Sequence, residues 1–362
     1  MTSSAPVSFP LERPARNQAY DLLRILSIFA VVAIHTFGAI AANPVIAGSA
    51  SAWGARVLSA GSVWSVPVFV MLSGALNLGA RAHRDGPRAF YAKRFRRIVP
   101  ALLVWNIVYL VLVRLLLLHE HLSGRQIVGT LIDTTVYPQL YFLWLIAGLY
   151  AVAPVLAAFL AGGGTRRAVT FAVVTLGATQ LYFISLGVLA LAHMPQPLHW
   201  QALMFWIPYV GYFLVGYALS RLSLTRRWAV AALVGVVVLG AAAVLESGLL
   251  PRLRLLAALS TPDYQGTVTV LLSIAVFVAG TYFLARIPLS PRLGRFVVTL
   301  SEAAFGVFLV HLLVLLIPYR LLPGFGADRS LGEAAVAYLF ILIVSFAISI
   351  GARRVPGLRL IF

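Results

Sequence analysis

The sequence predicts an all-α integral membrane protein with about ten transmembrane helices and no separate soluble domain. Of the 362 residues, 61% are hydrophobic and only 10% are charged, and the mean hydropathy is +0.95. So few charged side chains could not cover the surface of a soluble domain. Apolar segments of about 20 residues, long enough to cross a hydrocarbon core about 30 Å thick, recur along the whole chain.

Ten segments meet this length requirement, and the connections between them carry most of the charges and much of the Pro and Gly. The segments lie approximately at 20–42, 56–79, 98–118, 140–161, 168–191, 201–220, 228–249, 266–285, 296–318 and 333–351. The chain then divides into an N-terminal tail (1–19), a transmembrane domain (20–351) and a C-terminal tail (352–362).

The distribution of positive charge predicts how these segments are oriented. With the N-terminus in the cytoplasm, twenty Lys and Arg residues fall on the cytoplasmic side, seven of them between Arg81 and Arg97, and only six fall on the outer side. Membrane proteins concentrate Lys and Arg in their cytoplasmic loops. We therefore expect both termini to be cytoplasmic. Topology also accounts for the excess of 28 Lys and Arg over 10 Asp and Glu, so we expect no nucleic acid partner.

A cleavable signal peptide is the alternative interpretation of the first segment. Basic residues precede an apolar run, and Ala39-Ile40-Ala41 has the small-x-small form of a cleavage site. The run is long for a signal peptide, however, and cleavage would remove the polar residues within it. We therefore favour a retained transmembrane helix.

Three polar residues interrupt the first apolar segment, DLLRILSIFAVVAIH: Asp21, Arg24 and His35. In a helix, Arg24 and His35 lie within about 20° of one face and about 16 Å apart along the axis. Asp21 lies one turn before Arg24. His35 is thereby placed beyond the bilayer midplane, where a titratable group is a functional candidate, either as a general base or as a nucleophile. The alternative is that Asp21 and Arg24 are interfacial and that His35 bonds to a neighbouring helix.

A second deep imidazole, His311, occurs in SEAAFGVFLVHLLVL. Counted from the cytoplasmic end of its segment, His311 reaches a depth similar to that of His35, so the two side chains could line one cavity. A structural histidine with satisfied hydrogen bonds is the alternative.

The densest basic segment, RAHRDGPRAFYAKRFRRIVP at 81–100, contains Arg94 and Arg97 at a spacing that points both the same way on a helix. A fork of guanidinium groups near a helix N-terminus suits phosphate binding, although topology alone would also place positive charge here. The chain has no cysteine, and the other histidines lack the spacing of metal ligands, so we expect no metal site.

Five motifs, in this order, resemble the membrane-bound acyltransferase 3 family, which includes bacterial glycan O-acetyltransferases. They are LRILSIFAVVAIH, with Arg24 and His35; SVPVFVMLSG, with Ser73; FYAKRFRRIVP, with Arg94 and Arg97; LYFLWLIAGLYAVAP, with Tyr150; and SEAAFGVFLVHLLVL, with His311. The motifs span most of the chain. Members of the family often carry His and Trp at the positions of Gln139 and Tyr141, and many carry a C-terminal hydrolase-like domain. This chain ends at Phe362 without one, so we expect it to act alone or with a partner.

The resemblance implies transfer of an acetyl or other acyl group from cytosolic acetyl-CoA to a hydroxyl of a cell-surface or exported polysaccharide, or of its lipid-linked repeat unit. It also implies a multi-pass protein in the bilayer of the bacterial inner membrane. Arg24, Arg94 and Arg97 would hold the phosphates of acetyl-CoA. His35 would be the general base or acyl carrier, and His311 would stabilise the oxyanion or orient the acceptor. Asp21, Ser73 and Tyr150 would have structural or orienting roles.

Two other classes of protein are compatible with the polar residues. In a polytopic transporter or flippase, buried Arg and His would form a substrate or proton path. That function predicts inverted repeats with paired broken helices, which are not evident in the sequence. In a non-catalytic membrane assembly component, the deep histidines would serve only in packing.

Overall fold

The computed structural model describes residues 16–194, 203–249, 253–261, 263–321 and 330–362, and in these ranges it is helical with no strand. The α-helices are α1 (Gln18–Ala42), α2 (Ala50–Ser59), α3 (Ser65–Asn77), α4 (Gly86–Ile107), α5 (Gly124–Ile132), α6 (Tyr141–Ala161), α7 (Gly164–Leu191), α8 (Val210–Ser220), α9 (Arg226–Leu249), α10 (Arg254–Leu259), α11 (Thr267–Phe283), α12 (Pro291–Leu321) and α13 (Leu331–Ala352). Short 3₁₀ segments are η1 (Ala60–Ser62), η2 (Ala80–His83), η4 (Ile207–Tyr209), η6 (Leu284–Arg286) and η7 (Leu358–Leu360), and the π-helix η3 (Val108–Leu117) continues α4.

The predicted all-α membrane fold is confirmed. Within the described ranges, nine helical stretches are long and apolar enough to cross a membrane. The exception among the ten predicted segments is 201–220, because its described part becomes helical only at Ile207 and forms one shorter apolar helix through η4 and α8. Pro208 lies in the first turn of this helix, where the missing backbone N–H costs nothing.

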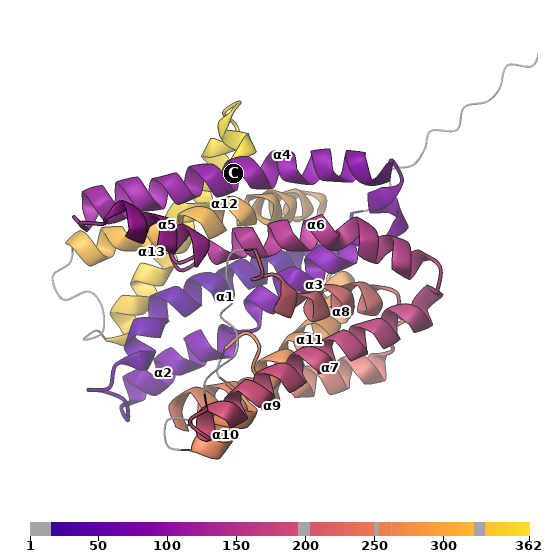
Figure 1. Cartoon of the computed structure of the whole chain (residues 1–362), viewed down its shortest axis with the longest axis horizontal. Helices are drawn as coiled ribbons and strands as arrows, with labels where there is room; N and C mark the ends of the chain where they lie inside the picture. Colours follow the sequence, from indigo (N-terminus) through magenta and orange to yellow (C-terminus); the bar gives the residue numbers. More distant parts are fainter. Residues whose placement is uncertain (1–15, 195–202, 250–252, 262, 322–329) are drawn as a thin grey trace, which may run out of the picture.

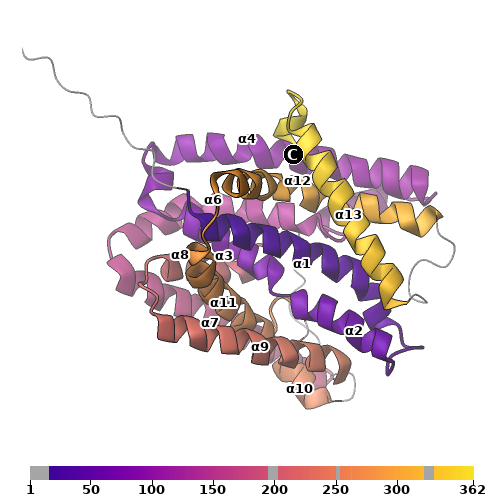
Figure 2. The ribbon, with the colours of Figure 1, turned by 180° about the vertical axis from the view of Figure 1, so that it is seen from behind.

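The helices pack as one bundle with α1 near its middle (Figures 1 and 2). In both views α4 runs along one edge and α9 and α10 lie toward the opposite edge. About two thirds of the apolar window of α12 (67%) and 56% of that of α1 are buried, against 11% for α7 and α9. Several polar side chains of α1 and α12 are therefore enclosed by protein, among them Ser27, Ser301 and His311, whereas α7 and α9 present mostly apolar surface to lipid.

The described chain enters and leaves the bundle at the same end. Arg16, just before α1, and Arg353, just after α13, both donate hydrogen bonds to the carboxylate of Glu302, at 2.7 and 2.8 Å. An even number of crossings gives this arrangement. Among the described helices nine are long enough to cross, so the short helix of η4 and α8 is the candidate for a tenth crossing.

Helices α3 and α8 cross with their backbones in direct contact. A Cβ atom added to Gly74 would overlap the carbonyl oxygen of Phe213, and one added to Gly216 would overlap that of Met71. Small residues permit this close approach between membrane helices. Gly74 thereby fixes the position of α3, which carries Ser73.

We expect Gly74→Ala to lower the melting temperature of the detergent-solubilised protein, because overpacking of this kind typically costs about 1–3 kcal/mol. Gly38→Ala is the matched control, since a Cβ at Gly38 in α1 has no atom within 4 Å. Equal melting temperatures for the two variants would show that the α3–α8 contact is not limiting for stability.

Candidate active site

A cavity of about 700 Å³ lies among α1, α3, α4, α6, α12 and the residues that follow α13. Its mouth is at the end of the bundle where the described chain enters and leaves, since Glu302 and Arg353 both line it. Among its lining residues are five of the eight residues that the sequence predicts for the site: Arg24, Ser73, Arg94, Arg97 and Tyr150. Three further cations, Arg81, Lys93 and Arg353, also line the cavity.

Aromatic rings hold the guanidinium groups of α4 in place. The central carbon of Arg94 lies 5.7 Å from the ring centres of both Phe90 and Tyr150, and that of Arg97 lies 4.9 Å from the ring centre of Phe305. A guanidinium stacked on a ring can present its N–H edge to an anion. In keeping with this, Nε of Arg94 is buried without a hydrogen-bond partner among the described residues. Nη2 of Arg97 already donates to the carbonyl oxygen of Phe362 at 3.1 Å, so only its remaining N–H groups are available. The arrangement suits a ligand with several phosphate oxygens.

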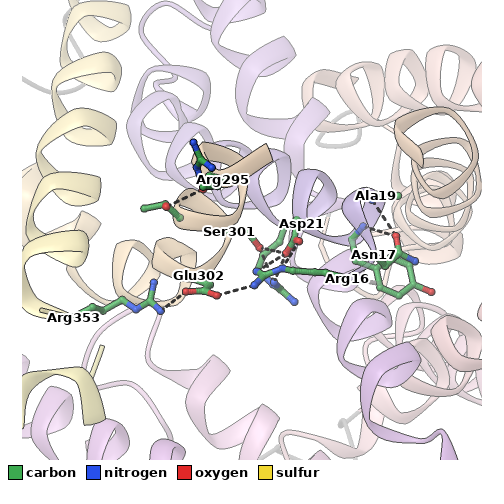
Figure 3. A network of polar contacts seen from close by, with 11 residues as sticks. Arg16, Asn17, Ala19, Asp21, Arg295, Ser301, Glu302 and Arg353 are labelled. Atoms are coloured by element: carbon green, nitrogen blue, oxygen red, sulfur yellow. Dashed lines mark hydrogen bonds and ion pairs between the residues drawn. The ribbon is translucent and has the colours of Figure 1, made fainter. Parts of the chain in front are cut away.

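Asp21 is the centre of an ion network at the start of α1 (Figure 3). Its side chain is 5% exposed and accepts hydrogen bonds from Nε and Nη2 of Arg16, at 2.6 and 2.9 Å. It also accepts from Nη1 of Arg24 at 3.3 Å and from the hydroxyl of Ser301 at 2.6 Å. Arg24 donates in turn to Ser301 at 2.7 Å. The Asp21 carboxylate raises the pKa of the Arg16 guanidinium above its usual range.

The two predicted histidines meet deeper in the bundle. The ring centres of His35 and His311 are 5.2 Å apart, with the ring planes at 45°. His311 is 1% exposed and His35 is partly exposed. His35 follows Arg24 by eleven positions on α1, and His311 follows Ser301 by ten positions on α12. Arg24 contacts Ser301 and His35 contacts His311, so the two helices run in the same direction and touch through polar residues at two levels about 15 Å apart.

The hydrogen bonds of His311 determine which of its nitrogens carries a proton. Nδ1 lies 2.8 Å from the carbonyl oxygen of Phe308 and 3.2 Å from that of Val307. A carbonyl oxygen can only accept, so Nδ1 of the neutral ring carries the hydrogen. Nε2 is buried without a partner among the described residues. Its lone pair is therefore free to accept a proton or a hydrogen bond.

The site combines a cation-lined cavity with a histidine pair deeper in the bundle, and comparison with known proteins identifies the family of the chain. The model of the acyltransferase 3 family, described as an acyltransferase domain, matches residues 17–354. The chain belongs to the acyltransferase 3 family. No curated protein and no solved structure gives a significant match. The match covers all five motifs and nearly all described helices of this membrane acyltransferase.

The acyltransferase has a further buried group, Tyr109, against the turn of α12 that carries His311. Its hydroxyl donates to the carbonyl of Leu309 at 2.7 Å and accepts from the amide of Leu313 at 3.2 Å. In a regular helix these two backbone groups pair with each other. Leu309 and Leu313 stand two residues before and two residues after His311, so the Tyr109 hydroxyl holds the turn of α12 that carries this histidine.

The predicted site of the acyltransferase thus has two parts. Five predicted residues line the cavity, Asp21 lies behind Arg24, and the two histidines lie beyond the cavity's lining. Within the described ranges, no group of three His, Asp or Glu side chains gathers as metal ligands would.

Five polar residues of the site were not predicted from the sequence: Arg16, Tyr109, Ser301, Glu302 and Arg353. A usable signal existed for Ser301, because its spacing to His311 nearly equals that from Arg24 to His35.

Proposed function

We propose that this acyltransferase moves an acetyl group from cytosolic acetyl-CoA to a hydroxyl of a cell-surface or exported polysaccharide, or of its lipid-linked repeat unit, in the bacterial inner membrane. The observation that supports this most strongly is the cation-lined cavity, which extends toward the paired imidazoles of His35 and His311. An anionic donor would enter at the cations, and its reactive end would meet a base.

In this proposal Arg24, Arg94 and Arg97 bind the phosphates of acetyl-CoA through charge-assisted hydrogen bonds. Tyr150 stacks on Arg94, and Asp21 holds Arg24, so these two residues orient the guanidinium groups. Arg24 and His35 are about 16 Å apart along α1, which leaves room for the extended arm of the donor. Ser73 lines the wall along which this arm would lie.

The reaction requires one proton to be taken up and later returned. In the direct route, an imidazole nitrogen of His35 takes the proton of the acceptor hydroxyl as the oxygen attacks the thioester carbonyl. The new C–O bond forms, the C–S bond breaks, and the CoA thiolate receives the proton from the imidazolium. In the alternative route, a neutral nitrogen of His35 attacks the thioester carbonyl, the C–S bond breaks, and the CoA thiolate leaves with the ring proton. The acceptor hydroxyl then takes the acyl group from the imidazole and returns its own proton to the ring.

Neutral His311 suits a supporting role in either route. Because its Nδ1–H is bonded to backbone carbonyls, the free Nε2 offers a lone pair rather than a donor. This favours a hydrogen bond accepted from His35 or from the acceptor hydroxyl over donation to an oxyanion. We propose that His311 orients the group that is deprotonated.

Replacing His35 with Ala tests the catalytic assignment. We expect the O-acetyl signals of the surface glycans in NMR spectra to fall to the level of a whole-gene deletion, with the variant still present in the membrane. His121→Ala, at an exposed position between η3 and α5, is the control and should acetylate normally. Unchanged acetylation in His35→Ala would contradict the assignment. A deletion that stops glycan export instead of acetylation would favour the transporter.

A further inference from the structure

Three phenylalanine rings from three helices line the deep end of the donor cavity. Phe69 of α3, Phe142 of α6 and Phe308 of α12 all line the cavity. The ring centres of Phe69 and Phe142 are 6.3 Å apart, and those of Phe142 and Phe308 are 5.0 Å apart. The Phe308 ring lies 5.9 Å from that of His311, which is buried and does not itself line the cavity. We call these three rings the aromatic end wall.

The cavity changes character with depth in the same way on each of these helices. Polar side chains line it near the mouth, and an aromatic ring lines it about two turns further in. From mouth to end wall, lining residues include Asn77, Ser73 and Phe69 on α3; Tyr150, Ile146 and Phe142 on α6; and Ser301, Ala304 and Phe308 on α12. The first and last residues of each set are seven or eight positions apart, so the cavity is about 10–12 Å deep along the helices.

We infer that the aromatic end wall limits the size of the acyl group that can reach the histidine pair. The inference rests on the proposed function. The thioester carbonyl reacts only when it approaches an imidazole, and Phe308 lies between the cavity and His311. The acyl group must therefore lie against Phe142 and Phe308 at the moment of transfer. Apolar pockets discriminate by roughly 10–200-fold for each additional methylene, so the wall favours acetyl over longer acyl groups.

A role in packing alone gives a different expectation. Phe142 and Phe308 are almost fully buried, so truncating either would destabilise the protein whatever its role in selection. Lost stability lowers the amount of active enzyme and reduces transfer from every donor by the same factor. Selection by size instead changes the ratio between donors, and this ratio is independent of the amount of active enzyme.

The test compares acyl donors in inside-out membrane vesicles that contain the full-length chain and supply their own glycan acceptors. Radiolabelled acetyl-, propionyl- and butyryl-CoA are offered separately, and label in the glycan fraction gives kcat/KM for each. We expect Phe142→Ala and Phe308→Ala to raise the butyryl-to-acetyl ratio at least tenfold. Ile146→Ala is the matched control, because it removes an apolar side chain one turn nearer the mouth on the same helix, and its ratio should stay within twofold of the wild type.

Each outcome bears on the inference. A ratio that stays within twofold of the wild type in both Phe variants would overturn it, as would an equal rise in Ile146→Ala. If an alanine variant does not accumulate in the membrane, Phe142→Leu and Phe308→Leu remove less volume, and the same ratio is measured with them. Failure of the proposed function looks different, because wild-type vesicles would then transfer no label from acetyl-CoA to glycan.

Discussion

Replacing His311 with Ala should reduce acyl transfer by about 10²-fold, the loss expected when a group that positions a reacting partner is removed. The centre of its ring lies 5.2 Å from that of His35, and its Nε2 is buried without a partner among the described residues. The substitution leaves the cations at the cavity mouth untouched, since His311 does not line the cavity. Affinity for acetyl-CoA should therefore change by less than about threefold, which separates lost chemistry from lost donor binding.

The control for His311 is a neighbour on the same helix. Leu315→Ala removes a buried side chain one turn further along α12, so it lowers stability but leaves both imidazoles in place. Label transfer from saturating acetyl-CoA in vesicles, normalised to the folded protein present, should be near normal in Leu315→Ala and almost absent in His311→Ala. Equal activities in the two variants would assign His311 to packing.

Helical periodicity was sufficient to predict that Arg24 and His35 lie on one face of α1. Arg24 and His35 are just over three full turns apart, so their shared face follows from the sequence alone. The depth of His311 followed in the same way from the length of its own segment. The contact between the two imidazoles could not be predicted in this way, because periodicity identifies the face of one helix and not the helix that packs against it. Matched depth allowed the two imidazoles to line one cavity, and the family resemblance then assigned both to one site.

Residues that act across helices were missed for the same physical reason. In the sequence alone, Ser301 and Glu302 resemble ordinary residues of the membrane interface. Only the packing of α12 against α1 shows that Ser301 forms hydrogen bonds with Asp21 and Arg24. Tyr109 could not be predicted from the sequence for a second reason. It lies in the π-helix η3, whose wider turns shift the angular position of each following residue, so a 3.6-residue period cannot assign its face. Aromatic residues such as Phe142 gave no signal, because a membrane segment is apolar on every side.

Loss of the ion network around Asp21 should have a large effect on the stability of the protein. Asp21→Ala removes the shared acceptor of Arg16, Arg24 and Ser301. Removing one partner of a buried ion pair typically costs about 3–5 kcal/mol, and the partial exposure of Arg16 and Arg24 places the expected loss at the lower end of this range. Asp85→Ala is the matched control, because Asp85 pairs with Arg84 at 3.4 Å on the surface, where an ion pair contributes no more than about 1 kcal/mol. We expect a clear fall in melting temperature for the Asp21 variant alone.

The same substitution should change how the protein responds to its donor. Without Asp21, the guanidinium of Arg24 loses its carboxylate partner while still lining the cavity. Donor phosphates would then supply the missing negative charge, and a ligand that binds only the folded state raises its stability. Acetyl-CoA should therefore raise the melting temperature of Asp21→Ala more than that of the wild type. Asp21→Asn, which keeps an acceptor oxygen but no charge, should fall between the two. A donor-induced shift in Asp21→Ala no larger than that of the wild type would show that Arg24 does not meet the donor's phosphates, and Asp21 would then serve only to join α1 to α12.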